Sequence, residues 1–173
     1  MPAGGPPRSR LITGVFHYGN PLNQSDTLIF SDEFIDIKFS VLEKLIDFHI
    51  QNKTNEGIKI NWDELSFISP DGTASRVNHS SGIRVIEKGN PQVPTVIPPN
   101  TKISDSLIPT KNIYYSYDWN AKDLFPGENK IIYNDKEFGI YFPIEIKGSK
   151  KEYTFKFKIN VSQTTTVPVN KIR

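Results

Sequence analysis

A strict alternation of apolar and polar residues near the C-terminus constrains the fold of this chain more than any other sequence feature. Even-numbered positions from Ile140 to Ile146 are apolar, as are odd-numbered positions from Tyr153 to Ile159. Successive side chains of a β-strand point to opposite faces, so this period of two predicts a β-hairpin over 138–160 with one buried face. Because Pro143 has no N–H, its strand is expected at a sheet edge, or with Pro143 facing away from the ladder.

The same period of two recurs upstream, at 34–39 and 46–51, and no long amphipathic helix pattern is present. A Pro-Asp-Gly turn is predicted at 70–72, and the proline-rich segment 89–100 is predicted to be an extended connection between sheets. Short strands with turn signals about every ten residues favour an all-β fold. We predict a single immunoglobulin-like Greek-key β-sandwich of about eight or nine strands, with Trp62 at its centre.

The length of 173 residues suits one domain with a well-buried core. We expect a flexible Pro/Gly lead-in over 1–25, the β-sandwich over 26–161 and a C-terminal tail over 162–173. No run of about 18 apolar residues is present, and the first residues lack the apolar core of a signal peptide. The net charge of +2 comes from interspersed acids and bases, which predicts no nucleic-acid partner.

Few residues offer catalytic or metal chemistry. The chain has no cysteine, which excludes disulfides and thiolate sites. The three histidines are far apart in the sequence, and on an extended chain His79 and the adjacent Ser80 would point to opposite faces. We therefore expect no metal site and no cofactor, and the sequence predicts that the protein is not an enzyme. The histidines are His17, His49 and His79.

Two pairs of neighbouring acids leave a hydrolase open as an alternative, since glycosidic chemistry needs two carboxyl groups at the right separation. The pairs are Asp32 with Glu33 and Asp63 with Glu64. Both pairs occur where turns place solvated acids, which is the interpretation we favour. Arg76 is expected to pair with an acid.

An aromatic cluster in the stretch 112–127 is the best candidate for a binding site. We interpret this stretch as an irregular loop, with Asn120 a possible N-cap for a single helical turn. Amphipathic rings in an irregular segment are typical of a partner-binding loop, although they could instead cover one end of the sandwich. The candidate residues are Tyr114, Tyr115, Tyr117 and Trp119.

The stretch from about residue 30 to 160 resembles a group of uncharacterised bacterial envelope proteins, many of them lipoproteins. The resemblance implies an immunoglobulin-like sandwich in the bacterial cell envelope or outside the cell, with no established activity. The lipidated cysteine of a lipoprotein is absent, and Gly5 could stand where that cysteine would be, so membrane attachment would require a lost lipid anchor. The motif positions that carry the resemblance are Asn52, Trp62, Asp71, Gly72, Ser75, Arg76, Val77, His79 and Pro98.

The sequence thus predicts a non-enzymatic interaction module of the cell envelope or a secreted one, with a protein partner or self-assembly rather than a small molecule. A structural subunit of an extracellular assembly, in which a terminal tail adds a strand to a neighbour, is the first alternative. The acid-pair hydrolase is the second. Four N-x-[ST] triplets could be glycosylated in a glycosylating host; they begin at Asn23, Asn52, Asn78 and Asn160.

Overall fold

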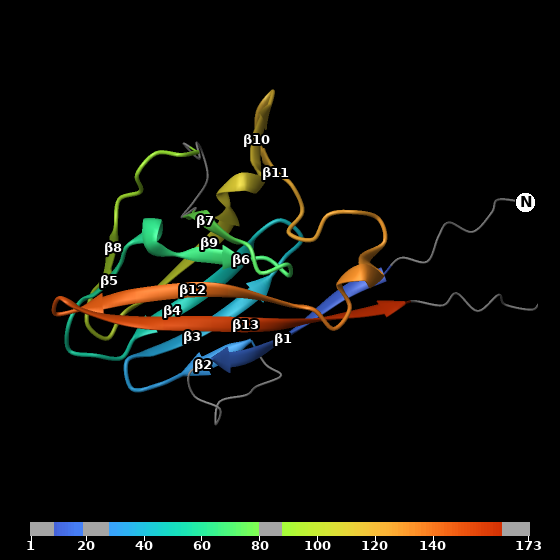
Figure 1. Ribbon diagram of the computed structural model, residues 1–173. Helices are drawn as coiled ribbons and strands as arrows, with labels where there is room; N and C mark the ends of the chain where they lie inside the picture. The colour runs from blue at the N-terminus through green and yellow to red at the C-terminus, as the bar shows by residue number, and fades with distance from the viewer. Residues whose placement is uncertain (1–8, 19–27, 80–87, 164–173) are drawn as a thin grey trace, which may run out of the picture.

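Two antiparallel sheets packed face to face make up the fold (Figure 1). The structure is a computed structural model that describes residues 9–18, 28–79 and 88–163, and the side chains of 28–79 and 88–159. The first sheet contains β1 (Ser9–Tyr18), β13 (Ser149–Gln163), β12 (Glu137–Ile146), β6 (Ser66–Ile68), β5 (Ile58–Ile60) and β8 (Thr95–Ile97). The second contains β9 (Lys102–Pro109), β4 (Ile46–Asn52), β3 (Ile35–Val41) and β2 (Ile29–Ser31).

Strand β7 (Ala74–His79) joins the two sheets along one side. Its first half pairs with β6, where Arg76 lies opposite Ser66, and its second half pairs with β9, where Val77 lies opposite Pro109. One strand therefore belongs to both sheets and carries the hydrogen-bonded path continuously from β1 to β2.

The strand order identifies the kind of sandwich. One sheet runs β3-β4-β9-β7, and in the other β6 and β5 pair in turn with one edge of β12, whose opposite edge pairs with β13. These are the A-B-E-D and C-F-G orders of an immunoglobulin-like Greek key, as the sequence predicts. The expected eight or nine strands become thirteen in the described part of the chain. The additional strands are β1, which lies in the expected lead-in, β2 and β8, which have only three residues each, and two strands within 113–121, where an irregular loop is predicted.

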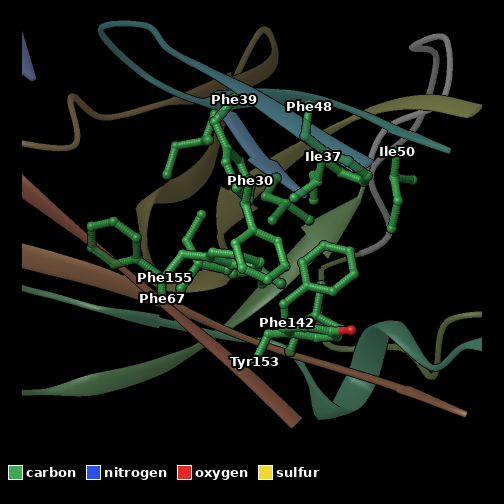
Figure 2. Packing of buried hydrophobic residues seen from close by; sticks show 14 of the residues in the cluster. Phe30, Ile37, Phe39, Phe48, Ile50, Phe67, Phe142, Tyr153 and Phe155 are labelled. Carbon is green, nitrogen blue, oxygen red and sulfur yellow. The ribbon is translucent and has the colours of Figure 1, made fainter. Parts of the chain in front are cut away.

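The alternation of buried and exposed side chains along the strands shows that the core lies between the two sheets. In β3, Ile35, Ile37 and Phe39 are buried while the residues between them are more exposed. Figure 2 shows Phe39, Phe48 and other side chains of the second sheet facing Phe142 and Phe155 of the first. Trp62 lies among them with no exposed surface, in the short 3-10 helix η2 (Trp62–Glu64) that follows β5, and so fills the centre as predicted.

The predicted C-terminal hairpin is confirmed. β12 and β13 pair over ten residues through a two-residue turn, and positive φ angles of 50° at Lys147 and 74° at Gly148 suit the twist of the strands. Of the two expectations for Pro143, the edge position is wrong, since β12 has neighbours on both sides. Pro143 falls between the stretch of β12 that pairs with β6 and the stretch that pairs with β5, where no N–H is required.

The expected domain boundaries differ from the observed strands. β1 lies within the segment 1–25, which the sequence predicts to be a lead-in, and it pairs with β13 from Ser9 opposite Gln163 to Tyr18 opposite Thr154. The strand is possible there because it begins after the proline-rich residues and occupies the outer edge of the sheet. β13 ends at Gln163, close to the expected end of the sandwich at 161, and residues 164–173 lie outside the described part.

Candidate functional site

A two-stranded hairpin projects from the sandwich, and it carries the predicted aromatic cluster (Figure 1). β10 (Ile113–Ser116) and β11 (Asp118–Ala121) form a separate antiparallel sheet and, in the described part of the chain, pair only with each other. Tyr115 lies opposite Trp119, and Tyr117 occupies the turn. We call residues 113–121 the aromatic hairpin.

The base of the aromatic hairpin is fixed to the body. The 3-10 helix η3 (Thr110–Asn112) precedes it, and Ile113 is buried at its root with 1% of its surface exposed. The backbone N–H of Lys122 donates to the carbonyl of Asn112 at 2.9 Å, and Lys88 Nζ donates to the carbonyl of Ile113 at 2.8 Å. The hairpin is thus held at its base while its distal half meets solvent.

Exposure rises along the aromatic hairpin towards its turn. The exposed fraction is 38% for Tyr114, 66% for Tyr115 and 101% for Tyr117. The rings of Tyr115 and Trp119 meet edge to face with their centroids 5.7 Å apart. Tyr117 has a φ of 60°, a left-handed conformation that costs a bulky residue on the order of 1–3 kcal/mol. A large ring is therefore held in solvent on a strained backbone.

The structure places all four predicted residues on one hairpin and brings Tyr115 and Trp119 into contact, but the predicted irregular loop is wrong. Asn120 lies within β11 and does not begin a helical turn. Tyrosine and tryptophan favour strands, whereas the stretch lacks the Asn-Gly or Asp-Gly turn by which short hairpins are recognised. The signal that could have found this hairpin is the aromatic content on both sides of Tyr117.

An open pocket of about 270 Å³ lies at the base of the aromatic hairpin. Lys111 and Asn112 line it from the chain entering the hairpin, and Asp123 and Leu124 from the chain leaving it. Asp123 is paired with Lys130 at 3.6 Å. The remaining lining residues are Phe67, Ser69, Pro70, Asp71, Pro126, Tyr133 and Lys136.

Of the two acid pairs of the hydrolase alternative, Asp63 with Glu64 is engaged in other contacts. Partial desolvation raises the pKa of Asp63, but hydrogen bonds from Gln92 and Arg76 lower it below its usual value. Lys150 donates to Glu64 and lowers the pKa of that carboxyl as well. A general acid requires a raised pKa, so neither carboxyl suits proton donation near neutral pH. Arg76 does pair with an acid, as the sequence predicts.

These lowered values predict how stability depends on pH. Because both carboxyls have a lower pKa in the folded chain, their contribution is present above the unfolded values of about 4 and is lost as the pH falls below them. The free energy of unfolding should therefore decrease between about pH 5 and pH 2, and less steeply in the Asp63→Asn variant. NMR titration of the carboxyl groups measures the pKa of Asp63 and of Glu64 directly. A midpoint above pH 5 for Asp63 or Glu64 would contradict this assignment.

The histidines serve structural contacts where their side chains are described. His79 stacks on Trp62 with ring centroids 4.1 Å apart, and its Nδ1 lies 2.8 Å from Asp105 Oδ2. His49 is exposed and contacts Ser104 Oγ. The side chain of His17, and Ser80 as a whole, lie outside the described part. Within the described residues no three acidic or histidine side chains are placed to hold a metal ion.

Two of the four N-x-[ST] triplets are inaccessible in the folded chain. Asn52 has no exposed surface, and Asn78 is 3% exposed and accepts a hydrogen bond from Thr110 Oγ1 at 2.7 Å. The side chains of Asn23 and Asn160 lie outside the described part. Sequence reasoning missed the role of Asn52, whose amide joins segments that are distant in the chain.

Comparison with known proteins leaves the chain without a family. No family model matches it, and no curated protein matches it. Among solved structures, the GAE domain of Gga2p from Saccharomyces cerevisiae aligns with a TM-score of 0.30 and 13% identity, covering 82% of this chain and 98% of that one. A Northeast Structural Genomics Consortium target aligns with a TM-score of 0.25 and 10% identity, covering 96% of this chain and 94% of that one. Likenesses this weak carry no inference about function. No helix in the described part is long and apolar enough to cross a membrane.

Proposed function

We propose that this protein is a non-enzymatic interaction module that binds a protein partner through the aromatic hairpin. The observation that carries the proposal is Tyr117, which is fully exposed on a strained backbone at the end of a projecting hairpin. The exposure of the ring disfavours the free molecule, and the strained backbone holds the ring in this position. A bound partner that covers the ring would remove the cost of its exposure.

The composition of the aromatic hairpin suits protein recognition. Tyrosine and tryptophan are enriched at interface hot spots, because they bury a large rigid surface and keep a polar atom for hydrogen bonding. Tyr115 and Trp119 already support each other edge to face, so little side-chain freedom would be lost on binding. The interpretation that these rings cover one end of the sandwich is disfavoured by the exposure of Tyr115 and Tyr117.

The alternative of a structural subunit that donates a terminal strand has less support. β1 pairs over ten residues with β13 of its own chain, so the ladder that this alternative would use is filled within the molecule. The cell envelope or the extracellular space stays a prediction, carried by the sequence resemblance. We do not propose the acid-pair hydrolase, because Asp63 and Glu64 are each paired with a cation.

Replacing the aromatic hairpin side chains should abolish partner binding without unfolding the protein. The test variant carries Tyr115→Ser, Tyr117→Ser and Trp119→Ser. The full-length protein and this variant are immobilised and exposed to an extract and medium of the source cells, and retained proteins are identified by mass spectrometry. A partner is then purified, and its affinity for each protein is measured by calorimetry. We expect a loss of at least about thirtyfold, as for a hot spot worth 2 kcal/mol.

A matched control replaces two other exposed apolar residues. Val93 precedes β8 and is 82% exposed, and Val96 lies within β8 and is 58% exposed. The control variant, with Val93→Ser and Val96→Ser, therefore removes apolar surface outside the hairpin. The control should bind the partner like the original protein, and urea unfolding should show both variants to be folded. Equal affinity of the hairpin variant and the original protein would refute the proposal.

A further inference from the structure

We propose that the outer edge of β11 pairs with β11 of a second copy of this chain, across a two-fold axis through Asn120. The inference rests on the proposed function, because it names a partner for the aromatic hairpin. It joins two two-stranded hairpins into one four-stranded sheet. A lone two-stranded hairpin is marginally stable in water, and additional strands satisfy its free edge.

The hydrogen-bonding phase of the hairpin shows which backbone groups face outward. The bond from the Lys122 N–H to the Asn112 carbonyl places a hydrogen-bonded pair at the base. Hydrogen-bonded and non-hydrogen-bonded pairs alternate in an antiparallel ladder, so Trp119 and Ala121 are in non-hydrogen-bonded pairs. Their N–H and C=O groups point away from β10.

Local contacts agree with this phase. The N–H of Trp119 donates to Asp118 Oδ1 at 2.7 Å, and the N–H of Ala121 donates to Asn120 Oδ1 at 2.8 Å. Neither N–H is used within the hairpin ladder, so both are available to exchange a side-chain acceptor for a carbonyl of another strand. The outer edge of β10 is less available, because Lys88 Nζ already bonds the Ile113 carbonyl.

The sequence of β11 and its next residue is complementary to itself. An antiparallel pair centred on Asn120 places Trp119 opposite Ala121 of the second copy, and Ala121 opposite Trp119. These residues carry the outward backbone groups, so the register forms two hydrogen-bonded pairs with four N–H···O=C bonds.

The side chains favour the same register. Asp118 lies opposite Lys122 of the second copy, twice by symmetry, and opposite charges in cross-strand pairs are favourable. The large Trp119 faces the small Ala121, which leaves room for the ring. A register centred on Trp119 would instead place Asp118 opposite Asn120 and lose both charge pairs.

The contact is small, so the dimer should be weak. A hairpin edge buries less than the roughly 1,200 Å² of a stable interface, which places it among transient contacts. Lys44 Nζ lies 3.4 Å from Asn120 Oδ1, a long contact that is exposed and can adjust when the second copy binds. We therefore expect the monomer to predominate at low concentration and the dimer to accumulate as concentration rises.

Charge reversal at the two paired positions tests the register. Sedimentation equilibrium is measured over a range of concentrations for the full-length protein, for Asp118→Lys, for Lys122→Asp, and for the variant with both changes. Each single reversal brings like charges together twice and should weaken dimerisation about tenfold. The double reversal restores opposite charges and should return the dimerisation constant to within about threefold of the original.

A backbone test complements the charges. Ala121→Pro removes an N–H that the hairpin ladder does not use, and should abolish the dimer while circular dichroism and urea unfolding show a folded domain. A monomer at every concentration, or single reversals that leave dimerisation unchanged, would overturn the inference. If the protein stays monomeric while the triple serine variant still loses a heterologous partner, the self-pairing fails and the proposed function stands.

Discussion

Replacing Trp62 with alanine should lower the free energy of unfolding by about 3–5 kcal/mol, a large part of the stability of a domain of this size. Trp62 is fully buried, stacks on His79 and packs at 6.1 Å, centroid to centroid, against Phe48. Its Nε1 donates to Thr95 Oγ1 at 3.0 Å, so truncation also leaves that hydroxyl without its donor. Urea unfolding followed by circular dichroism measures the change.

The size of the effect follows from how the two sheets are joined. Phe48 of β4 and Phe142 of β12 meet edge to face with centroids 5.5 Å apart, beside Trp62. These strands correspond to strands B and F of an immunoglobulin fold, which antibody domains join by a disulfide. Since this chain has no cysteine, aromatic packing is what connects the sheets at this point. Removal of the central ring leaves a cavity with no covalent link to limit the loss.

The second tryptophan provides the matched control. Trp119 lies on the aromatic hairpin, so Trp119→Ala should change the free energy of unfolding by no more than about 0.5–1 kcal/mol. The single tryptophan left in each variant also reports its own site by fluorescence, with Trp62 emitting from an apolar environment. A loss for Trp119→Ala as large as for Trp62→Ala would show that the hairpin is part of the core and would remove the basis for proposing it as a binding element.

Replacing Asn52 with alanine should lower the free energy of unfolding by about 2–4 kcal/mol, as expected when several buried polar groups lose their partner. The Nδ2 group of Asn52 donates to the carbonyls of Glu56, Ile97 and Pro98 at 2.6, 3.0 and 3.1 Å. Its Oδ1 accepts from the N–H and the hydroxyl of Thr54 at 2.8 Å. One amide thus fixes the turn after β4 and ties it to the strand β8.

Neighbouring substitutions separate the amide's bonds from general effects on the turn. Asn55 is exposed in the same turn, so Asn55→Ala should change stability by less than about 0.5 kcal/mol. Asn52→Asp keeps the acceptor for Thr54 but places a carboxylate against the carbonyls, and should be at least as destabilising as Asn52→Ala. If alanine at 52 were tolerated like alanine at 55, the hydrogen bonds of Asn52 would not hold the turn.

Part of this structure could be predicted because it depends on nearest neighbours along the chain. The alternation from Ile140 to Ile159 identifies the β12–β13 hairpin and its buried face, and Pro70 to Gly72 identifies a turn. Trp62 is recognisable as a core residue because it continues the alternation of Ile58 and Ile60. Each of these predictions needs only a short stretch of sequence.

The candidate site was found by composition and misjudged in conformation. The composition from Tyr114 to Trp119 predicts a binding segment, because amphipathic rings are typical of partner-binding loops. Its hairpin was not recognised, because Tyr117 adopts a left-handed backbone without the glycine or asparagine that usually signals one. The sequence could not show whether these rings cover the sandwich or face solvent, because that depends on the position of the hairpin relative to the two sheets.

The sequence by itself determined that the segments with a long alternation, β3, β4, β12 and β13, form strands and which of their faces is buried, since alternation with a period of two is a property of a single strand. Only the tertiary structure decided which strands are neighbours, how β7 serves both sheets, and that Asn52 bonds to carbonyls 45 and 46 residues away. The physical reason is that pairing between distant segments depends on closing long loops around a shared core. No short stretch of sequence carries that information.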